Sequence, residues 1–162
     1  MSKEDTPKFV ADVMLGSLSR WLRLFGFDTL YFNNSIDKEL IKISLQQNRI
    51  LLTKDNALAR CKLLKKVLLI KSEEIKDQIK EVLKYTGISK LFLSLPPRCP
   101  VCNGETKIID RGEIDSEVPE YIFFTKDFYR KCKQCGKIYW YGSHMDSIEK
   151  MKEEIFNEIG LK

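Results

Sequence analysis

The chain has 162 residues, of which 43% are hydrophobic and 31% charged, and its formal net charge is +5 at pH 7. This length fits one compact domain or two small ones and excludes several large domains within this sequence. The composition is that of a folded chain with a well-solvated surface, not that of a disordered one.

No segment approaches the roughly 20 consecutive apolar residues that span a bilayer, and the polar start MSKEDTPK lacks the apolar core of a signal peptide. We therefore expect a cytoplasmic protein with no membrane partner. The positive charge is uneven: residues 1–97 hold 17 Lys and Arg against 11 Asp and Glu, whereas residues 98–162 hold 11 against 12. A partner that carries phosphates would meet the first part more readily. A lysine-rich solvated surface explains the same counts.

The first part alternates short apolar runs with helical patterns. The runs predict strands at residues 9–12, 29–32, 50–53 and 67–70. The patterns predict a helix over residues 15–25, one that is capped by Ser35 or Asp37 and ends at Asn48, one opened by Asp55, and one from about 73 to 85. Because parallel strands need crossover connections, this order indicates an α/β domain whose parallel sheet is covered on both faces.

The pattern changes after LSLPPR, where Gly, Pro and paired cysteines replace the helical periodicity. Short strands are expected at residues 106–109, 128–130 and 138–141, and a final helix, able to pack on either module, at 146–159. The chain is therefore predicted to have three parts: residues 8–95, residues 98–145 and a helical tail over residues 146–162.

Four of the five cysteines form two pairs, Cys99-Pro-Val-Cys102 and Cys132-Lys-Gln-Cys135. Two residues between ligands allow a tight turn to direct both sulfurs at one ion, so this spacing favours a structural zinc site with all four positions filled. Disulfides or a redox-active pair are the competing interpretation, which a cytosolic setting disfavours.

Acidic residues follow three of the predicted strands. Asp12 ends the first strand, Asp37 opens the helix after the second, and Asp55 follows the third. In an open α/β sheet these strand ends face one crevice, so the three carboxylates are expected to converge there and to hold Mg²⁺ or Mn²⁺. For Asp37 and Asp55, a simple helix-capping role explains the sequence equally well.

Basic residues near this crevice are candidates for contact with phosphates. Arg20 and Arg23 lie one turn apart on the first predicted helix, and Lys54 precedes Asp55. A solvated helix face would look the same. His144 is the only histidine, and we interpret it as a phosphate donor or loop-orienting residue; no nucleophile is placed beside it for a Ser-His-Asp or Cys-His mechanism.

Together, several stretches resemble the Mut-seven C-terminal RNase domain family, a PIN-like nuclease fold joined to a zinc ribbon. They are FVADVMLGSLSRWLRLFGFDTLYF, ILLTKD, RCPVCNG, the Val118-Pro119 step and CKQCGKIYWYGSH. The resemblance implies a metal-dependent ribonuclease that acts on RNA, with ribosomal or transfer RNA as candidate targets. Asp12, Asp37 and Asp55 match its acidic positions, the four cysteines its ribbon, Arg20 and Arg23 its first helix, and Ser143-His144 its GSH element.

One position departs from the wider PIN pattern. Near the end of the fourth strand, where a fourth acidic residue is usual, this chain has Lys71-Ser72, followed by Glu73 and Glu74. Asp28 is an alternative, although GFDT is also typical of a turn before a strand.

Other classes of protein remain as alternatives. The first is a non-catalytic RNA- or ribosome-binding protein that keeps the fold, and the second is the nuclease of a toxin and antitoxin pair. An aspartyl phosphatase would need an Asp where Met14 stands, and the MLGSLS segment lacks the glycines and Lys of a nucleotide-binding loop.

Overall fold

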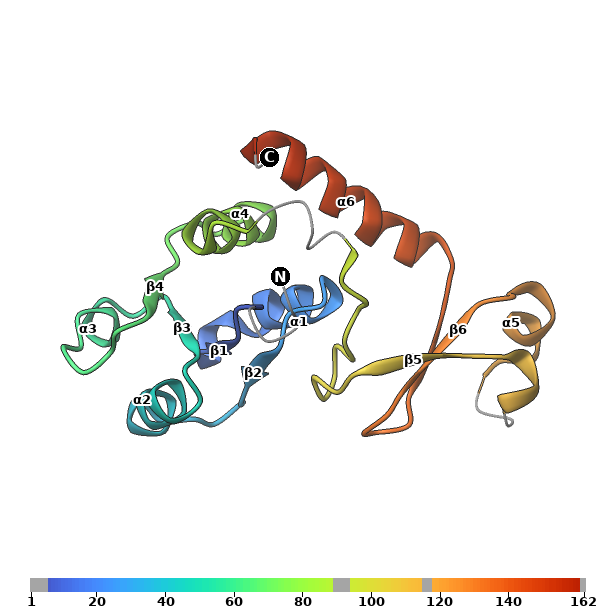
Figure 1. Ribbon diagram of the computed structural model, residues 1–162, viewed down its shortest axis with the longest axis horizontal. Helices are drawn as coiled ribbons and strands as arrows, with labels where there is room; N and C mark the ends of the chain where they lie inside the picture. The colour runs from blue at the N-terminus through green and yellow to red at the C-terminus, as the bar shows by residue number, and fades with distance from the viewer. Residues whose placement is uncertain (1–5, 89–93, 115–117, 161–162) are drawn as a thin grey trace.

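Two β-sheets organise the chain in the computed structural model, which describes residues 6–88, 94–114 and 118–160, without the side chains of Ser143 and His144. Figure 1 shows a parallel sheet wrapped by helices and, beside it, a smaller antiparallel sheet. The final helix leaves the small sheet and returns across the first part of the chain. The fold class predicted from the sequence is confirmed.

The parallel sheet has the strand order β2-β1-β3-β4. Its strands are β1 (Phe9–Ala11), β2 (Thr29–Tyr31), β3 (Ile50–Thr53) and β4 (Val67–Leu69). In register, Ala11 lies beside Tyr31 on one side and beside Leu52 on the other. All four strands form where the apolar runs predict them, within one residue at each end.

Helices cover both faces of this sheet, because the strands are apolar at successive positions and therefore bury side chains on both sides. Phe9 and Leu52 face a core shared with three helices, α1 (Gly16–Leu24), α4 (Ile75–Thr86) and α6 (Ser143–Ile159). Val10 and Leu51 face the second core, with α2 (Asp37–Gln46) and α3 (Asn56–Ala59). A 3₁₀ turn, η2 (Val13–Leu15), joins β1 to α1.

The small sheet is antiparallel, with the order β5-β6-β7. Its strands are β5 (Thr106–Ile109), β6 (Tyr129–Cys132) and β7 (Ile138–Trp140), and between β5 and β6 lie the 3₁₀ turn η4 (Arg111–Glu113) and the helix α5 (Glu120–Thr125). The short runs at residues 106–109, 128–130 and 138–141 predict these three strands, whereas α5 is not predicted from the sequence.

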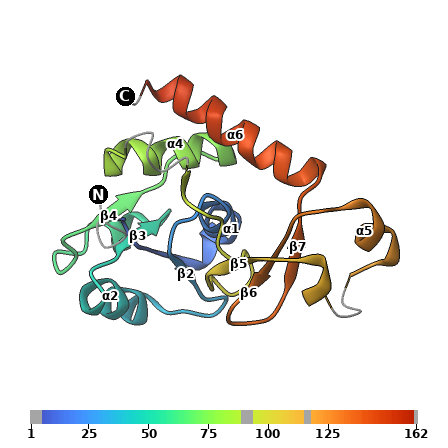
Figure 2. The same ribbon diagram turned by 45° about the vertical axis from the view of Figure 1, so that its right-hand side comes forward.

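The last helix packs against the first part of the chain, where Figures 1 and 2 both show α6 lying over α4. Ile155 and Phe156 are buried in the same core as β1. Glu158 accepts ion pairs from Lys76 and Lys80 of α4 at 2.6 Å each. The helix begins at Ser143, earlier than the periodicity predicts. None of the helices in the described residues is both long enough and apolar enough to span a bilayer.

One lysine of α6 is buried in this packing. Lys152 is 7% exposed, and its ammonium lies 5.6 Å from the centre of the Phe25 ring and 3.5 Å from the carbonyl oxygen of Leu95. Burial lowers the pKa of Lys152 from 10.5 to about 8, with Glu149 acting in the opposite direction. Burying the charged ammonium of Lys152 therefore lowers the free energy of unfolding near neutral pH.

Replacing this charge with an apolar side chain should stabilise the protein. We expect Lys152→Met to raise the free energy of unfolding at pH 7 by about 2 kcal/mol. As pH rises from about 8 towards 10.5, the folded wild type loses its proton before the unfolded chain does, so the wild type gains stability and the difference shrinks. Urea unfolding at pH 7 and pH 10 measures both effects, with exposed Lys150→Met as the control. A Met variant less stable than wild type at pH 7 would contradict the prediction.

Candidate functional site

The strand order places a switch point between β1 and β3. The chain crosses from β1 to β2 on one side of β1, whereas β3 pairs with β1 on the other side. Ligands of open α/β sheets bind outside the carboxyl ends of the strands at such a point. We call the end of the sheet where β1, β2 and β3 finish the carboxyl edge.

Asp12 and Asp55 are connected at this edge through one threonine. Asp12 follows β1 and is 6% exposed, and its Oδ2 accepts a 2.7 Å hydrogen bond from the hydroxyl of Thr53, the last residue of β3. The same hydroxyl oxygen accepts a 2.9 Å hydrogen bond from the backbone N–H of Asp55. Thr53 is fully buried in the sheet, so its hydroxyl has a defined position. Through this hydroxyl it orients both Asp12 and the backbone of Asp55.

Asp55 also caps α3, as the sequence suggested. Its Oδ1 accepts hydrogen bonds from the N–H groups of Ala57 at 2.6 Å and Leu58 at 3.0 Å. In the described residues, no protein donor bonds the second oxygen of either carboxylate, Asp12 Oδ1 or Asp55 Oδ2. Carboxylate oxygens without a protein donor are the ligands that hard cations such as Mg²⁺ and Mn²⁺ take, so the donor set fits such an ion.

The expected convergence of all three aspartates is not seen. Asp37 is exposed in the first turn of α2, beyond the loop that follows β2. In the part of the chain that the structure describes, the only group of three or more potential ligands within 4.8 Å of one another is made of cysteines. The helix cap is also different from the prediction, since Ile36 occupies it without a side-chain bond.

Lys54 lies at the same edge but is already paired. Its ammonium is 2.5 Å from a carboxylate oxygen of Glu73, whose side chain is 84% exposed, whereas that of Lys54 is 16% exposed. A phosphate at Lys54 would have to compete with Glu73. After β4, Glu81 of α4 accepts hydrogen bonds from the N–H groups of Lys71 and Ser72, so it holds that segment in place.

Several apolar side chains are exposed near the carboxyl edge, because they belong to the turns that follow β1 and β2. Met14 is 62% exposed and Phe32 41%, and Val13 and Ile36 are exposed as well. Since Ala11 pairs with Tyr31, Phe32 follows β2 at the position next to Asp12. Exposed aromatic and apolar surfaces of this kind suit the faces of unstacked bases.

The two arginines of α1 have different environments. Arg20 is exposed. Arg23 is 6% exposed, and its guanidinium donates to the carbonyl oxygens of Thr29 at 2.8 Å, Pro100 at 3.0 Å and Val101 at 3.1 Å. Burial lowers the pKa of Arg23, while the negative charges of Cys99, Cys102 and Asp28 act to raise it. The predicted pair of phosphate-binding arginines is thus not presented on one exposed face, because Arg23 connects α1 to the first cysteine pair.

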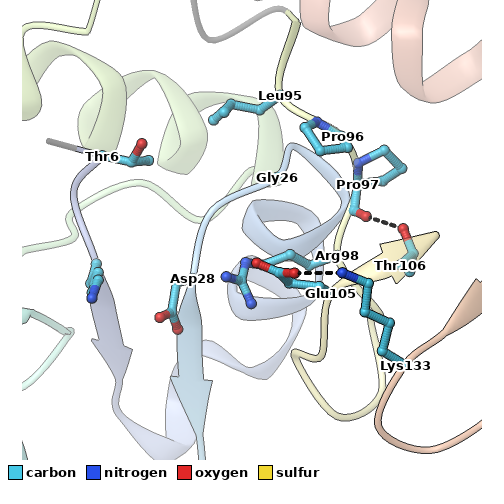
Figure 3. Close-up of a pocket in the computed structure, with 11 residues that line it drawn as sticks. Thr6, Gly26, Asp28, Leu95, Pro96, Pro97, Arg98, Glu105, Thr106 and Lys133 are labelled. Carbon is cyan, nitrogen blue, oxygen red and sulfur yellow. Dashed lines mark hydrogen bonds and ion pairs between the residues drawn. The ribbon is translucent and has the colours of Figure 1, made fainter. Parts of the chain in front are cut away.

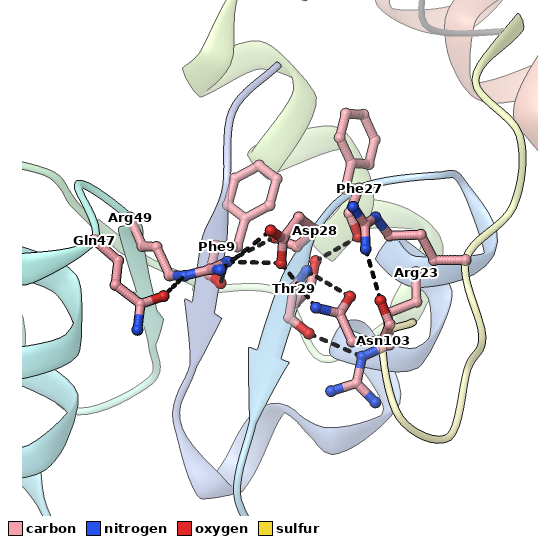
Figure 4. Close-up of polar contacts among 9 residues, drawn as sticks. Phe9, Arg23, Phe27, Asp28, Thr29, Gln47, Arg49 and Asn103 are labelled. Carbon is pink, nitrogen blue, oxygen red and sulfur yellow. Dashed lines mark hydrogen bonds and ion pairs between the residues drawn. The ribbon is translucent and has the colours of Figure 1, made fainter. Parts of the chain in front are cut away.

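Arg23 belongs to a polar network at the opposite end of the sheet, shown in Figure 4. Asn103 accepts a 2.9 Å hydrogen bond from the N–H of Thr29, at the start of the edge strand β2, and donates a 2.7 Å bond to Asp28. Asp28 is bound through both oxygens by Arg49, at 2.8 and 3.1 Å. Burial alone would raise the pKa of Asp28, but the bonds from Arg49 and Asn103 hold it below its usual value. Asp28 lies before β2, so it does not supply a fourth carboxylate at the carboxyl edge.

The four cysteines form one cluster, as their spacing predicts. Their sulfurs all lie within 4.8 Å of one another, with 3.7 Å between Cys99 and Cys135 and 3.4 Å between Cys102 and Cys132. Tetrahedral zinc with Zn–S bonds of about 2.3 Å requires separations of about 3.8 Å. The arrangement can therefore hold a zinc ion.

The chemistry around the sulfurs fits a cation. The N–H of Cys102 points at the sulfur of Cys99, and the N–H of Cys135 at the sulfur of Cys132, at 3.5 Å each. Burial opposes ionisation of Cys99, but the hydroxyl of Tyr139 and nearby N–H groups lower its pKa to about 7. Burial and the neighbouring thiols raise the pKa of Cys102 to about 12. Four ionised thiols require a cation between them.

Gly104 lets the backbone approach the cysteine cluster closely, because a Cβ at this position would lie 2.8 Å from the sulfur of Cys132.

His144 is the second residue of α6, after Ser143, and its side chain lies outside the described residues. Its predicted contact with phosphate therefore stays a prediction.

The structure thus describes an α/β protein with two linked carboxylates at its switch point and a four-cysteine ribbon packed against the other end of its sheet. The family model of the Mut7-C RNAse domain matches residues 7–152, and the chain belongs to this family. The family description indicates a nuclease or RNA-related role with RNA as the substrate. Comparisons with curated proteins and with solved structures found no match.

Proposed function

We propose that the protein is a metal-dependent ribonuclease that hydrolyses RNA phosphodiester bonds at the carboxyl edge. The observation that carries the proposal is the Asp12–Thr53–Asp55 connection at the β1/β3 switch point, which holds two carboxylates with oxygens available for a cation. Asp12 and Asp55 would hold Mg²⁺ or Mn²⁺, and Asp37 would complete the site from α2. When bound, such an ion activates water and stabilises the charge that develops on the phosphodiester.

The chain's own residues position the RNA. Exposed Arg20 would contact a phosphate, whereas Phe32 and Met14 would lie against bases. Lys54 would take part once a phosphate displaces Glu73. The surplus positive charge of residues 1–97 favours the approach of a polyanion.

Each of the first two parts predicted from the sequence has its own role. Residues 8–95 form the PIN-like nuclease module, and residues 98–145 form the zinc ribbon that assists RNA docking. The third part, residues 146–162, includes most of α6, although this helix begins at Ser143, before the proposed boundary. Ribosomal or transfer RNA is the proposed target, and the cytoplasm, which keeps four thiols reduced, is the proposed compartment.

Removing the hydroxyl that links the two carboxylates should impair both positions. We expect Thr53→Val to lose the hydrogen bond to Asp12 and the acceptor for the Asp55 N–H, which lowers the free energy of unfolding by about 1–2 kcal/mol. Cleavage should fall by roughly 10- to 100-fold, since misplaced metal ligands cost about this much. Thr53→Ser, which keeps the hydroxyl, is the matched control. Equal cleavage rates for the Val variant and wild type would contradict this role.

The test of the proposed function is cleavage of end-labelled single-stranded and structured RNAs by zinc-loaded protein that has been freed of other divalent ions. Addition of Mg²⁺ or Mn²⁺, at constant zinc, should start cleavage. This design is preferable to a chelator alone, because a chelator would also remove the ion of the cysteine cluster. Intact RNA at every metal concentration would count against a nuclease.

The alternative is a non-catalytic RNA-binding protein with the same fold. It is favoured by one observation, the absence of Asp37 from any close group of ligands in the described chain. It predicts salt-sensitive RNA binding with no turnover in any metal.

A further inference from the structure

A cavity of about 330 Å³ lies at the end of the sheet opposite the carboxyl edge, between the first part of the chain and the ribbon. Figure 3 shows its walls, which come from the starts of β1 and β2, the segment before the first cysteine pair and the strand β5. Lys8 of this cavity and Asp12 of the carboxyl edge are four residues apart, or roughly 13 Å along an extended strand. The two sites can therefore be studied separately.

The walls of this cavity are preformed. Gly26 has a φ of 97°, and a Cβ at this position would lie 2.6 Å from the Cβ of Leu95, so only glycine lets this segment pack so closely. The hydroxyl of Thr106 donates a 2.6 Å hydrogen bond to the carbonyl of Pro97, and the N–H of Arg98 donates to the carbonyl of Arg23. A ligand would enter a pocket that needs little ordering.

Two cations of the lining, Lys8 and Arg98, form no close ion pair in the described residues. Asp28 is neutralised by Arg49 from outside the cavity, and Glu105 is paired with Lys133 at 3.0 Å. Arg98 donates to the carbonyl of Asn103 at 2.7 Å, but in the described residues neither Arg98 nor Lys8 forms an ion pair. Arg98 acts on Asp28 at longer range and helps to lower the pKa of that carboxyl, but the nearer partner of Asp28 is Arg49. Lys8 and Arg98, which line one preformed cavity without a close ion pair, favour an anionic ligand.

We propose that this cavity binds the phosphate of a nucleotide through Lys8 and Arg98. The carboxylates of Asp28 and Glu105, whose oxygens can each accept more than one hydrogen bond, would accept further bonds from ribose hydroxyls or base amino groups, and the apolar faces of Leu95 and Pro97 would contact the base. The ligand is a free nucleoside monophosphate or the phosphorylated end of an RNA strand. Only the second source rests on the proposed function, since it makes the cavity an anchor for the same RNA that reaches the carboxyl edge.

The test is equilibrium binding by titration calorimetry with the zinc-loaded full chain and no added Mg²⁺ or Mn²⁺. The probes are AMP, UMP, and a short RNA with either a 5′-phosphate or a 5′-hydroxyl. We expect Lys8→Gln to weaken the binding of the phosphorylated probes by at least about fivefold and Arg98→Gln to weaken it further. Lys84→Gln, at an exposed lysine of α4 outside the cavity, is the matched control and should leave binding unchanged.

The outcomes separate the two sources. Stronger binding of the 5′-phosphorylated RNA than of AMP or UMP, lost in Lys8→Gln, would assign the cavity to an RNA end, whereas equal binding of the free nucleotides would assign it to a mononucleotide. Binding that is the same in wild type and Lys8→Gln, or no binding of any phosphorylated probe at millimolar concentration, would overturn the proposal. Because Asp12→Asn leaves this cavity intact, loss of cleavage with retained binding in that variant would separate the two sites.

Discussion

Removal of the metal ion from the four-cysteine cluster is expected to lower the midpoint of thermal unfolding of the whole chain by roughly 10 °C or more. Structural zinc sites contribute directly to folding, so the ribbon should lose its structure without the ion. The effect should reach the first part of the chain, because the backbone of the first cysteine pair supplies acceptors to a buried cation of α1.

The link is Arg23. When residues 99–103 lose their fold, its guanidinium loses the carbonyls of Pro100 and Val101 while it remains buried in α1, and Thr29 of β2 loses its acceptor on Asn103. The guanidinium then keeps only its hydrogen bond to the carbonyl of Thr29, and removing partners of a buried charge costs about 3–5 kcal/mol. For a chain of this size, 1 kcal/mol shifts the unfolding midpoint by about 2–4 °C, which gives the expected shift.

The test compares two arginines of one helix. Arg23→Gln should lower the midpoint by a similar amount in the zinc-loaded protein, whereas Arg20→Gln, at an exposed position one turn earlier, should change it by no more than a degree or two, since exposed substitutions change stability by about 0.5 kcal/mol or less. Amide hydrogen exchange of Thr29 should accelerate on chelation. An unchanged exchange rate, together with an unchanged midpoint, would show that the ribbon and the sheet are energetically independent.

Periodicity and spacing were sufficient to predict the architecture. The strands β1 to β4 are short apolar runs between residues that break regular structure. Both cysteine pairs have the two-residue spacing that is typical of a metal site. The position of Asp55 after a strand and before a helix predicts both a ligand and a cap, and the structure confirms the cap.

Long-range partners were not predictable. Arg20 and Arg23 look alike in sequence, and only the folded chain shows that two of the three acceptors of Arg23 lie 77 and 78 residues away. The sequence pattern places Thr53 in a strand and says nothing of its hydroxyl, although its position at the end of β3, two residues before Asp55, is a weak signal for a hydrogen bond at the carboxyl edge. Asn103 is a weak signal too, because Asn is one of the residues that adopt a left-handed conformation and it directly follows the first cysteine pair. In the structure its φ is 66°.

Substitution of Asp12 should have the largest effect on activity. Its side chain is nearly buried, it is fixed by Thr53, and Asp12 Oδ1 has no protein donor in the described residues, which suits a metal ligand. Asp12→Asn keeps the shape and can still accept the hydrogen bond from Thr53, but it removes the negative charge. We expect the rate of RNA cleavage to fall by roughly 1,000-fold, or about 4 kcal/mol of transition-state stabilisation, with little change in the unfolding midpoint.

The most direct test of the central claim is a single-turnover cleavage assay of end-labelled RNA by zinc-loaded wild type, Asp12→Asn and Asp77→Asn in Mg²⁺ or Mn²⁺. Asp77 is an exposed aspartate of α4, so its variant controls for the loss of one surface charge. The account predicts rapid cleavage by wild type and Asp77→Asn and almost none by Asp12→Asn, with RNA binding retained. Equal cleavage by all three proteins would contradict it.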